Sequence, residues 1–146
     1  MAFTGNYVTN TYKNGLNTGT FNLGTGTDQT FRIALYTNAA SLDATTTGYT
    51  STGEVSASGY DAGGATLSIS QVPTVGASGT TSYYSFYNVS WSGAITARGA
   101  LIYKVDGTHG NPAMIVLDFG SDKTSTTTFS VQFPAATNTT AIVRIS

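Results

Sequence analysis

The chain has 146 residues, of which 9% are charged and 12% aromatic, and its formal net charge is -1. Soluble domains average about 25% charged residues, so Ser, Thr, Gly and Asn supply most of the polarity here. The scattered cations exclude the basic patch that nucleic-acid binding needs, and the absence of Cys excludes disulfides and thiolate metal sites. The length suits a single domain with a substantial core.

Residues 1–30 are predicted to form an N-terminal arm and a segment rich in Thr, Gly and Asn. A short helix is the alternative to an extended arm, with Asn6 as its cap and Gly15 at its end, although Thr is a poor helix former. The first residues have neither a basic start nor an apolar run, which predicts no signal peptide. The apolar stretches are too short for a membrane span, so no membrane partner is expected.

Residues 31–146 are predicted to form one all-β domain, an antiparallel β-sandwich of jelly-roll or immunoglobulin-like type. Apolar residues at every second position indicate about seven strands. These strands are expected at 31–36, 67–70, 83–91, 95–103, 114–119, 129–133 and 141–145. Gly99 lies inside a strand and predicts a bulge. The long connection 41–64 is expected to be functional or to contain a further strand at Glu54–Val55.

Few residues are candidates for chemistry. His109 is the single His, and with Asp106 it could serve as a base or a metal ligand, but the surrounding turn residues favour an exposed hairpin loop. The letters Asp-Phe-Gly at 118–120 occur without the other kinase motifs. Neither a phosphate-binding Gly-Lys-Ser/Thr loop nor a Gly-x-Ser-x-Gly elbow is present. We therefore expect no catalytic residue, no bound metal and no cofactor, and hence no enzyme.

Aromatic residues are the candidates for a partner surface, because Tyr and Trp are enriched at interface hot spots. One group lies in the expected strand 83–91 and the other in the arm. The candidate interface residues are Tyr83, Tyr84, Tyr87, Trp91, Phe3, Tyr7 and Tyr12. Burial of both faces of the 83–91 strand in the core is the competing interpretation, and a carbohydrate-binding platform is a second one.

Several blocks of the chain carry a resemblance to a known group of proteins: Phe31–Thr37, Leu42–Thr50, Glu54–Ser56, Gly59–Gly64, Val89–Trp91, Thr96–Tyr103 and Val116–Lys123. These blocks resemble small structural proteins of tailed bacteriophages. The similarity extends from about Phe31 to Pro134 and includes no catalytic motif. It implies a component of the virion, assembled in the cytoplasm of a host bacterium, without indicating capsid, neck or tail.

The leading hypothesis is a capsid decoration (cement) protein that binds the outer shell and stabilises it by non-covalent contacts between capsid subunits. Its partners would be the major capsid protein or other virion proteins and further copies of itself, since virion proteins act through symmetric, high-copy contacts. The arm would anchor on the capsid or swap onto a neighbouring copy, and deletion of residues 2–16 is expected to leave a folded domain. The alternatives are a neck or tail component (connector, tail or fibre base) and, third, a carbohydrate-binding adhesion module.

Overall fold

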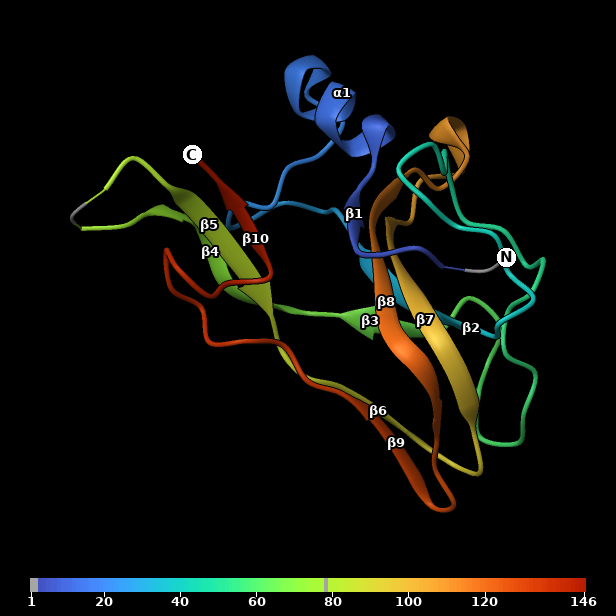
Figure 1. Ribbon diagram of the computed structural model, residues 1–146. Coiled ribbons are helices and arrows are strands. Elements are labelled where there is room, and N and C mark those ends of the chain that lie inside the picture. The colour runs from blue at the N-terminus through green and yellow to red at the C-terminus, as the bar shows by residue number, and fades with distance from the viewer. Residues whose placement is uncertain (1–2, 78) are drawn as a thin grey trace.

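The computed structural model describes residues 3–77 and 79–146 (Figure 1). The architecture is antiparallel and all-β, as the sequence predicts, with one short α-helix. The largest sheet has five strands in the order β1-β8-β7-β2-β3. Its strands are Tyr7–Val8 (β1), Phe31–Tyr36 (β2), Ala65–Leu67 (β3), Thr96–Lys104 (β7) and Ala113–Thr124 (β8).

Two smaller sheets form the opposite layer of the sandwich. The first, which we call the small sheet, has the order β10-β5-β4, and the second pairs β6 with β9. Their strands are Ile69–Val75 (β4), Ser82–Phe86 (β5), Val89–Ser92 (β6), Thr128–Val131 (β9) and Val143–Ile145 (β10). Figure 1 shows β6 continuing from the end of β5, so the two small sheets follow one another along the layer.

The five-stranded sheet is buried on both faces. Alternation along β2 directs Phe31, Ile33 and Leu35 into a large core that also receives Phe86 and Trp91 from the opposite layer. Complete burial of an Ile or Leu side chain stabilises the fold by about 1.5–3 kcal/mol.

The outer face of the same sheet carries a second apolar cluster. Ala34 and Tyr36 of β2 belong to this cluster. It is covered by Phe3 and by Ala40 and Leu42 of the connection between β2 and β3, so irregular chain replaces the second sheet there.

The N-terminal segment contains a strand and a helix, and its predicted helix bounds were wrong. The helix α1 spans Asn10–Thr18, with Thr9 as its N-cap and Gly19 as its left-handed C-cap. Thr9 Oγ1 accepts a hydrogen bond from the Tyr12 N–H at 3.1 Å, which satisfies a free donor of the first turn. Asn6 is therefore not the cap; its Oδ1 instead accepts a hydrogen bond of 2.7 Å from the Asp118 N–H of β8.

Three predictions about the strands need correction, and one is confirmed. The expected strand 83–91 is two strands in different sheets, because the chain leaves the small sheet at 87–88 and pairs with β9. The expected strand 67–70 is also divided between two sheets, because β3 ends at Leu67 and β4 begins at Ile69 and continues through Pro73, which an edge strand tolerates. Glu54 forms one isolated bridge to Tyr36 and no strand. The bulge at Gly99 is confirmed by a register shift between Ala97 and Gly99.

None of the helices that the structure describes between residues 3 and 146 is long and apolar enough to span a bilayer.

Candidate functional site

Four of the seven candidate interface residues are packed inside the chain itself. Phe3, Tyr12, Tyr84 and Trp91 are each less than a tenth exposed. The Tyr84 hydroxyl donates a buried hydrogen bond of 2.8 Å to the Tyr12 hydroxyl, which joins α1 to the small sheet. These four side chains belong to the cores of the domain, which is a correction to their interpretation as a partner surface.

The other three candidates reach solvent to different degrees. Tyr7 and Tyr83 are half-buried, whereas Tyr87 is 62% exposed. Tyr87 comes directly after β5, and its backbone N–H donates to the Ser68 carbonyl at 2.9 Å, so the backbone is fixed while the ring is free. Of the seven residues, Tyr87 alone presents most of its side chain to a partner.

A groove of about 550 Å³, which we call the small-sheet groove, lies between α1, the segment after it and the small sheet. Tyr12 and Tyr84 contribute to its walls beneath the surface, and Leu16 and Ile145 are its exposed large hydrophobic residues. Its other lining residues are Phe21, Asn22, Leu23, Gly24, Thr25, Val72, Pro73 and Ser82. The groove therefore has no charged side chain among its lining residues.

Exposed apolar side chains concentrate around the same sheet. In the part of the chain that the structure describes, the exposed large hydrophobic residues are Leu16, Val75, Tyr87, Val105 and Ile145. Val75 and Ile145 both pair with Ser82, on either side of β5, and Tyr87 follows that strand. Four of the five thus lie on the small sheet or beside it, and only Val105 lies elsewhere.

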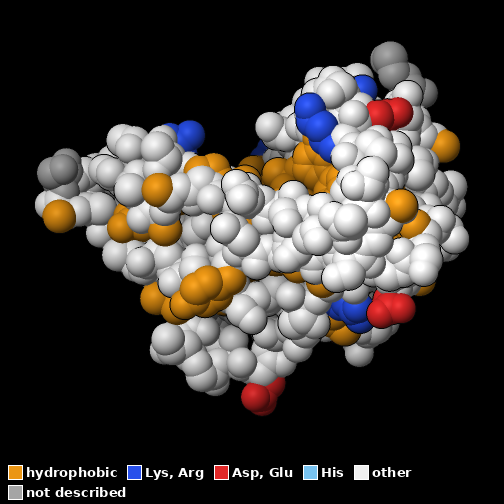
Figure 2. All heavy atoms as spheres, turned by 90° about the horizontal axis from the view of Figure 1, so that it is seen from below, with side chains coloured by type: hydrophobic (Ala, Val, Ile, Leu, Met, Phe, Trp, Pro, Cys, Tyr) orange, Lys and Arg blue, Asp and Glu red, His pale blue; other side chains and the backbone are white. Residues whose placement is uncertain are grey.

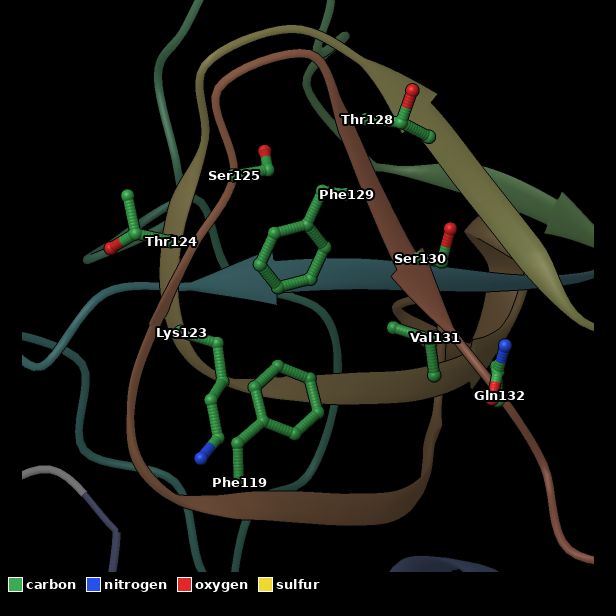
Figure 3. Close-up of a pocket in the computed structure, with 9 residues that line it drawn as sticks. All are labelled: Phe119, Lys123, Thr124, Ser125, Thr128, Phe129, Ser130, Val131 and Gln132. Carbon is green, nitrogen blue, oxygen red and sulfur yellow. The ribbon is translucent and has the colours of Figure 1, made fainter.

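A second groove, of about 450 Å³, lies where the chain turns from β8 to β9 (Figure 3). The rings of Phe119 and Phe129 lie next to one another in it, with centroids 6.2 Å apart and an angle of 40° between their planes. In Figure 3 the side chains of Thr128 and Ser130 point away from these rings. Phe119, Phe129 and Val131 give this groove its apolar part, and its other lining residues are polar, including the charged Lys123 beside Phe119.

Glu54 is the centre of a polar cluster on the edge of β2. Its Oε2 accepts a hydrogen bond of 2.6 Å from the Tyr49 hydroxyl, and its Oε1 accepts two of 2.7 Å, from the Tyr60 hydroxyl and the Gly63 N–H. The Tyr103 hydroxyl donates to the Gly63 carbonyl at 2.8 Å. Burial and the hydrogen bond to Glu54 raise the pKa of Tyr49 to about 12.

The predicted pair His109 and Asp106 does form. Asp106 caps the 3-10 turn Gly107–His109, and its Oδ2 lies 2.8 Å from His109 Nδ1 and 2.9 Å from Lys104 Nζ. The hydrogen bonds from Lys104 and His109 hold the pKa of the Asp106 carboxyl at about 2. The His109 side chain is 59% exposed. The arrangement is that of a capped hairpin turn, in agreement with the exposed hairpin loop that the surrounding turn residues predict.

Neither a cation site nor a sugar platform is assembled from the candidates. Within residues 3–77 and 79–146, no three His, Asp or Glu side chains come together in a way that could hold a metal ion. Trp91, one of the aromatic residues that a carbohydrate platform would use, packs between Tyr60 and Phe129 at centroid distances of 5.9 Å and 6.4 Å. Trp91 is 7% exposed and offers no open face for a sugar.

Two features of these sites were missed by sequence reasoning. The small-sheet groove brings Leu16 close to Ile145, and no periodicity relates residues so far apart in the chain. Glu54 carried a weak signal, because it is the only charged residue between Asp43 and Asp61 in a long polar connection. An isolated acid of this kind is a reason to expect a specific partner.

The chain matches no protein-family model, no curated protein and no solved structure.

Proposed function

We propose that this protein is a structural component of a tailed-bacteriophage virion, and more specifically a capsid decoration protein that binds the outer shell. The observation that carries the proposal is the concentration of exposed apolar side chains, Leu16, Val75, Tyr87 and Ile145, around the small sheet. The resemblance of residues 31–134 to virion proteins points to the same class of assembly.

The character of the remaining surface supports this proposal. Figure 2 shows a face on which backbone and uncharged polar side chains predominate, with a few charged side chains and several apolar patches. Such a surface can be packed against a neighbouring subunit without burying unpaired ions, each of which would cost several kcal/mol. The chain has only 13 charged residues, counting six Lys and Arg and seven Asp and Glu.

The small-sheet groove is the part of that surface best suited to a protein partner. Interface hot spots are apolar or aromatic anchors in desolvated pockets. Leu16 and Ile145 are 39% and 49% exposed at the groove, so a partner would bury apolar area there that water now covers. In a shell, many copies of one weak contact act together and so hold the layer stably in place.

Location and copy number in purified particles test the proposal. Quantitative mass spectrometry against the major capsid protein, followed by gold labelling, is expected to give hundreds of copies spread over the head. About a dozen copies at one vertex or along the tail would replace decoration by a neck or tail role. Absence from the particle would overturn both virion assignments.

Shell binding by surface variants tests the role of the groove. We expect Leu16→Ser and Ile145→Ser to weaken binding to undecorated shells about tenfold each, because a hot-spot truncation costs more than about 1 kcal/mol. Val105→Ser is the matched control, since Val105 is 43% exposed but lies away from the small sheet. Equal binding by all three variants and the unmodified protein would exclude the groove as the contact.

A further inference from the structure

The strands β6 and β9 continue the β7–β8 hairpin as one bent ribbon. The last pairs of the β7–β8 ladder and all pairs of the β6–β9 ladder have the same register. Between the two ladders, the Ser125 N–H donates to the Ile95 carbonyl and the Gly93 N–H donates to the Thr127 carbonyl, at 2.8 Å each. β8 and β9 therefore form one side of a two-stranded ribbon, and β7 and β6 form the other (Figure 1).

The outer side of β9 carries backbone groups that have no strand partner. Along an antiparallel ladder, residues whose backbone groups point toward the partner strand alternate with residues whose groups point away from it. The Thr127 carbonyl points toward the β6 side, because it accepts from Gly93. The alternation therefore directs the N–H and C=O groups of the β9 edge away from β6, and we define this edge as Thr128, Ser130 and Gln132.

The surroundings of the β9 edge leave room for another strand. In the described part of the chain β9 pairs with β6 only. All three residues of the β9 edge line the second groove, so open space lies beside them. The alternation holds to the end of the edge, because the next N–H, that of Phe133, donates on the β6 side to Asn88 Oδ1 at 2.8 Å.

The other strand edges among residues 3–77 and 79–146 have features that hinder pairing with a further strand. β1 and β3 have only two and three residues. β4 contains Pro73 and two register shifts, and Arg144 lies at the centre of the three-residue β10. The outer part of β8 carries Asp122 and Lys123, and Gly59 packs against the last residue of β6 on its outer side. The β9 edge has neither a proline nor a charge nor a covering segment.

We propose that a second copy of this chain pairs with the β9 edge, so that the two β9 strands run antiparallel about a two-fold axis at Ser130. The outward-pointing residues are evenly spaced about Ser130. Ser130 therefore meets Ser130 of the second copy, and Thr128 meets Gln132 of the second copy. Each such pair can exchange both of its N–H···O bonds. The result is one continuous four-stranded sheet across the dimer, in the order β6-β9-β9-β6.

The composition of the β9 edge favours a second copy as its partner. The sequence has no charged residue from Thr124 to Val143, so two copies bring no like charges together. On the inner face, Phe129 of each copy would lie opposite Val131 of the other, which is a favourable aromatic–β-branched pair. Both side chains are already buried in the single chain. The contact is therefore made mainly by the backbone, and we expect a reversible dimer.

Cysteine trapping tests the register of this dimer, because the chain has no Cys of its own. In the proposed pairing the two Ser130 Cα atoms lie about 5.5 Å apart, which is within the range of a disulfide. The two Thr128 Cα atoms lie about 14 Å apart, because each is displaced by four residues along the strand. We expect mild oxidation to link Ser130→Cys into a covalent dimer and to leave Thr128→Cys unlinked. Equal linking at both positions would overturn the proposal.

Sedimentation velocity of proline variants tests the hydrogen bonds of the pairing. Ser130→Pro removes an N–H that points away from β6, so the chain should stay folded, which circular dichroism checks. Ser90→Pro is the matched control, because Ser90 pairs with Ser130 and its N–H points toward the opposite edge of the ribbon. We expect the unmodified protein and Ser90→Pro to dimerise with similar affinity. Ser130→Pro should dimerise about tenfold more weakly or not at all, since it loses both central hydrogen bonds.

Two results would contradict pairing at the β9 edge. One is an unmodified protein that sediments as a monomer while Ser130→Cys forms no covalent dimer. The other is a dimer of unchanged affinity in folded Ser130→Pro, which would place the contact on another surface. Both measurements use the isolated chain, so their outcome is independent of shell binding through the small-sheet groove.

Discussion

The ring of Phe3 occupies the space into which a side chain at position 99 would project. A Cβ added to Gly99 would lie 2.5 Å from Phe3 Cε1 and closer still to the Leu117 carbonyl oxygen. Phe3 is 5% exposed and belongs to the outer apolar cluster. The absence of a side chain at Gly99 therefore makes room for the Phe3 ring to pack against β7 and β8.

Gly99→Ala tests this packing. The new methyl group has to displace both Phe3 and the backbone of β8, and overpacking of this kind costs about 1–3 kcal/mol. Urea unfolding followed by far-UV circular dichroism measures the loss. Gly107→Ala is the matched control, because no atom lies within 4 Å of its added Cβ. Equal stability of the two variants would show that Phe3 is not seated at Gly99.

The buried hydroxyl pair of Tyr12 and Tyr84 makes a prediction for a double-mutant cycle. Tyr84→Phe leaves the Tyr12 hydroxyl without its donor in the core and should cost about 1–3 kcal/mol of unfolding free energy. Tyr12→Phe should cost a similar amount. The double variant should lose less than the sum, since neither hydroxyl then remains unpaired. Strict additivity in urea unfolding would contradict a direct bond between them.

The Asp106 carboxyl gives a prediction for acid pH. Its pKa in the folded chain, about 2, lies below that of an unfolded Asp, because Lys104 and His109 donate to it. This carboxylate therefore stabilises the fold above about pH 4, and the contribution is lost as the pH falls from about 4 to about 2.

NMR titration of the side-chain carboxyl carbon measures this pKa directly. Lys104→Met should move the Asp106 pKa upward, because the Lys104 hydrogen bond is the largest cause of the depression, and His109→Gln should move it upward as well. Lys123→Met is the control, since Lys123 Nζ bonds to Ser121 and not to Asp106. An Asp106 pKa that is unchanged in Lys104→Met would refute the ion pair.

Deletion of residues 2–16 is now expected to destabilise the domain instead of leaving it folded. The deletion removes β1, Phe3 and Tyr12, and the loss of one buried Phe alone costs about 3–5 kcal/mol. Thermal unfolding of the truncated chain should therefore begin at a clearly lower temperature. Unfolding at the same temperature as the unmodified protein would instead support an N-terminal arm that does not contribute to the stability of the domain.

Local patterns were sufficient to predict the class of the fold. The alternation in Phe31–Tyr36 identifies a strand and its inward face, because side chains on a strand alternate between two sides. Gly99 could be assigned to a bulge because a Gly in the interior of a strand often marks one. The break at residues 87–88 was missed, since the aromatic residues on both sides of it keep the composition of a strand while the chain passes from one sheet to another.

The candidate sites were less predictable than the fold. His109 and Asp106 could be paired because they are three residues apart in a turn. Tyr87 could be proposed for a surface, but its neighbours Tyr84 and Trp91 could not be distinguished from it, because burial depends on which sheet covers each face. The residues that close the small-sheet groove, Leu16 and Ile145, come from opposite ends of the chain.

The sequence by itself determined that this protein is a Thr-rich β-domain with few charged residues, because composition and two-residue periodicity are local properties that require no knowledge of tertiary contacts. Only the tertiary structure decided which aromatic rings are core and which are surface, and that Glu54 is bound by three donors of its own connection. Those outcomes depend on how strands that are distant in sequence pair, because the fold supplies the neighbours that make Glu54 half-buried and leave Leu16 exposed.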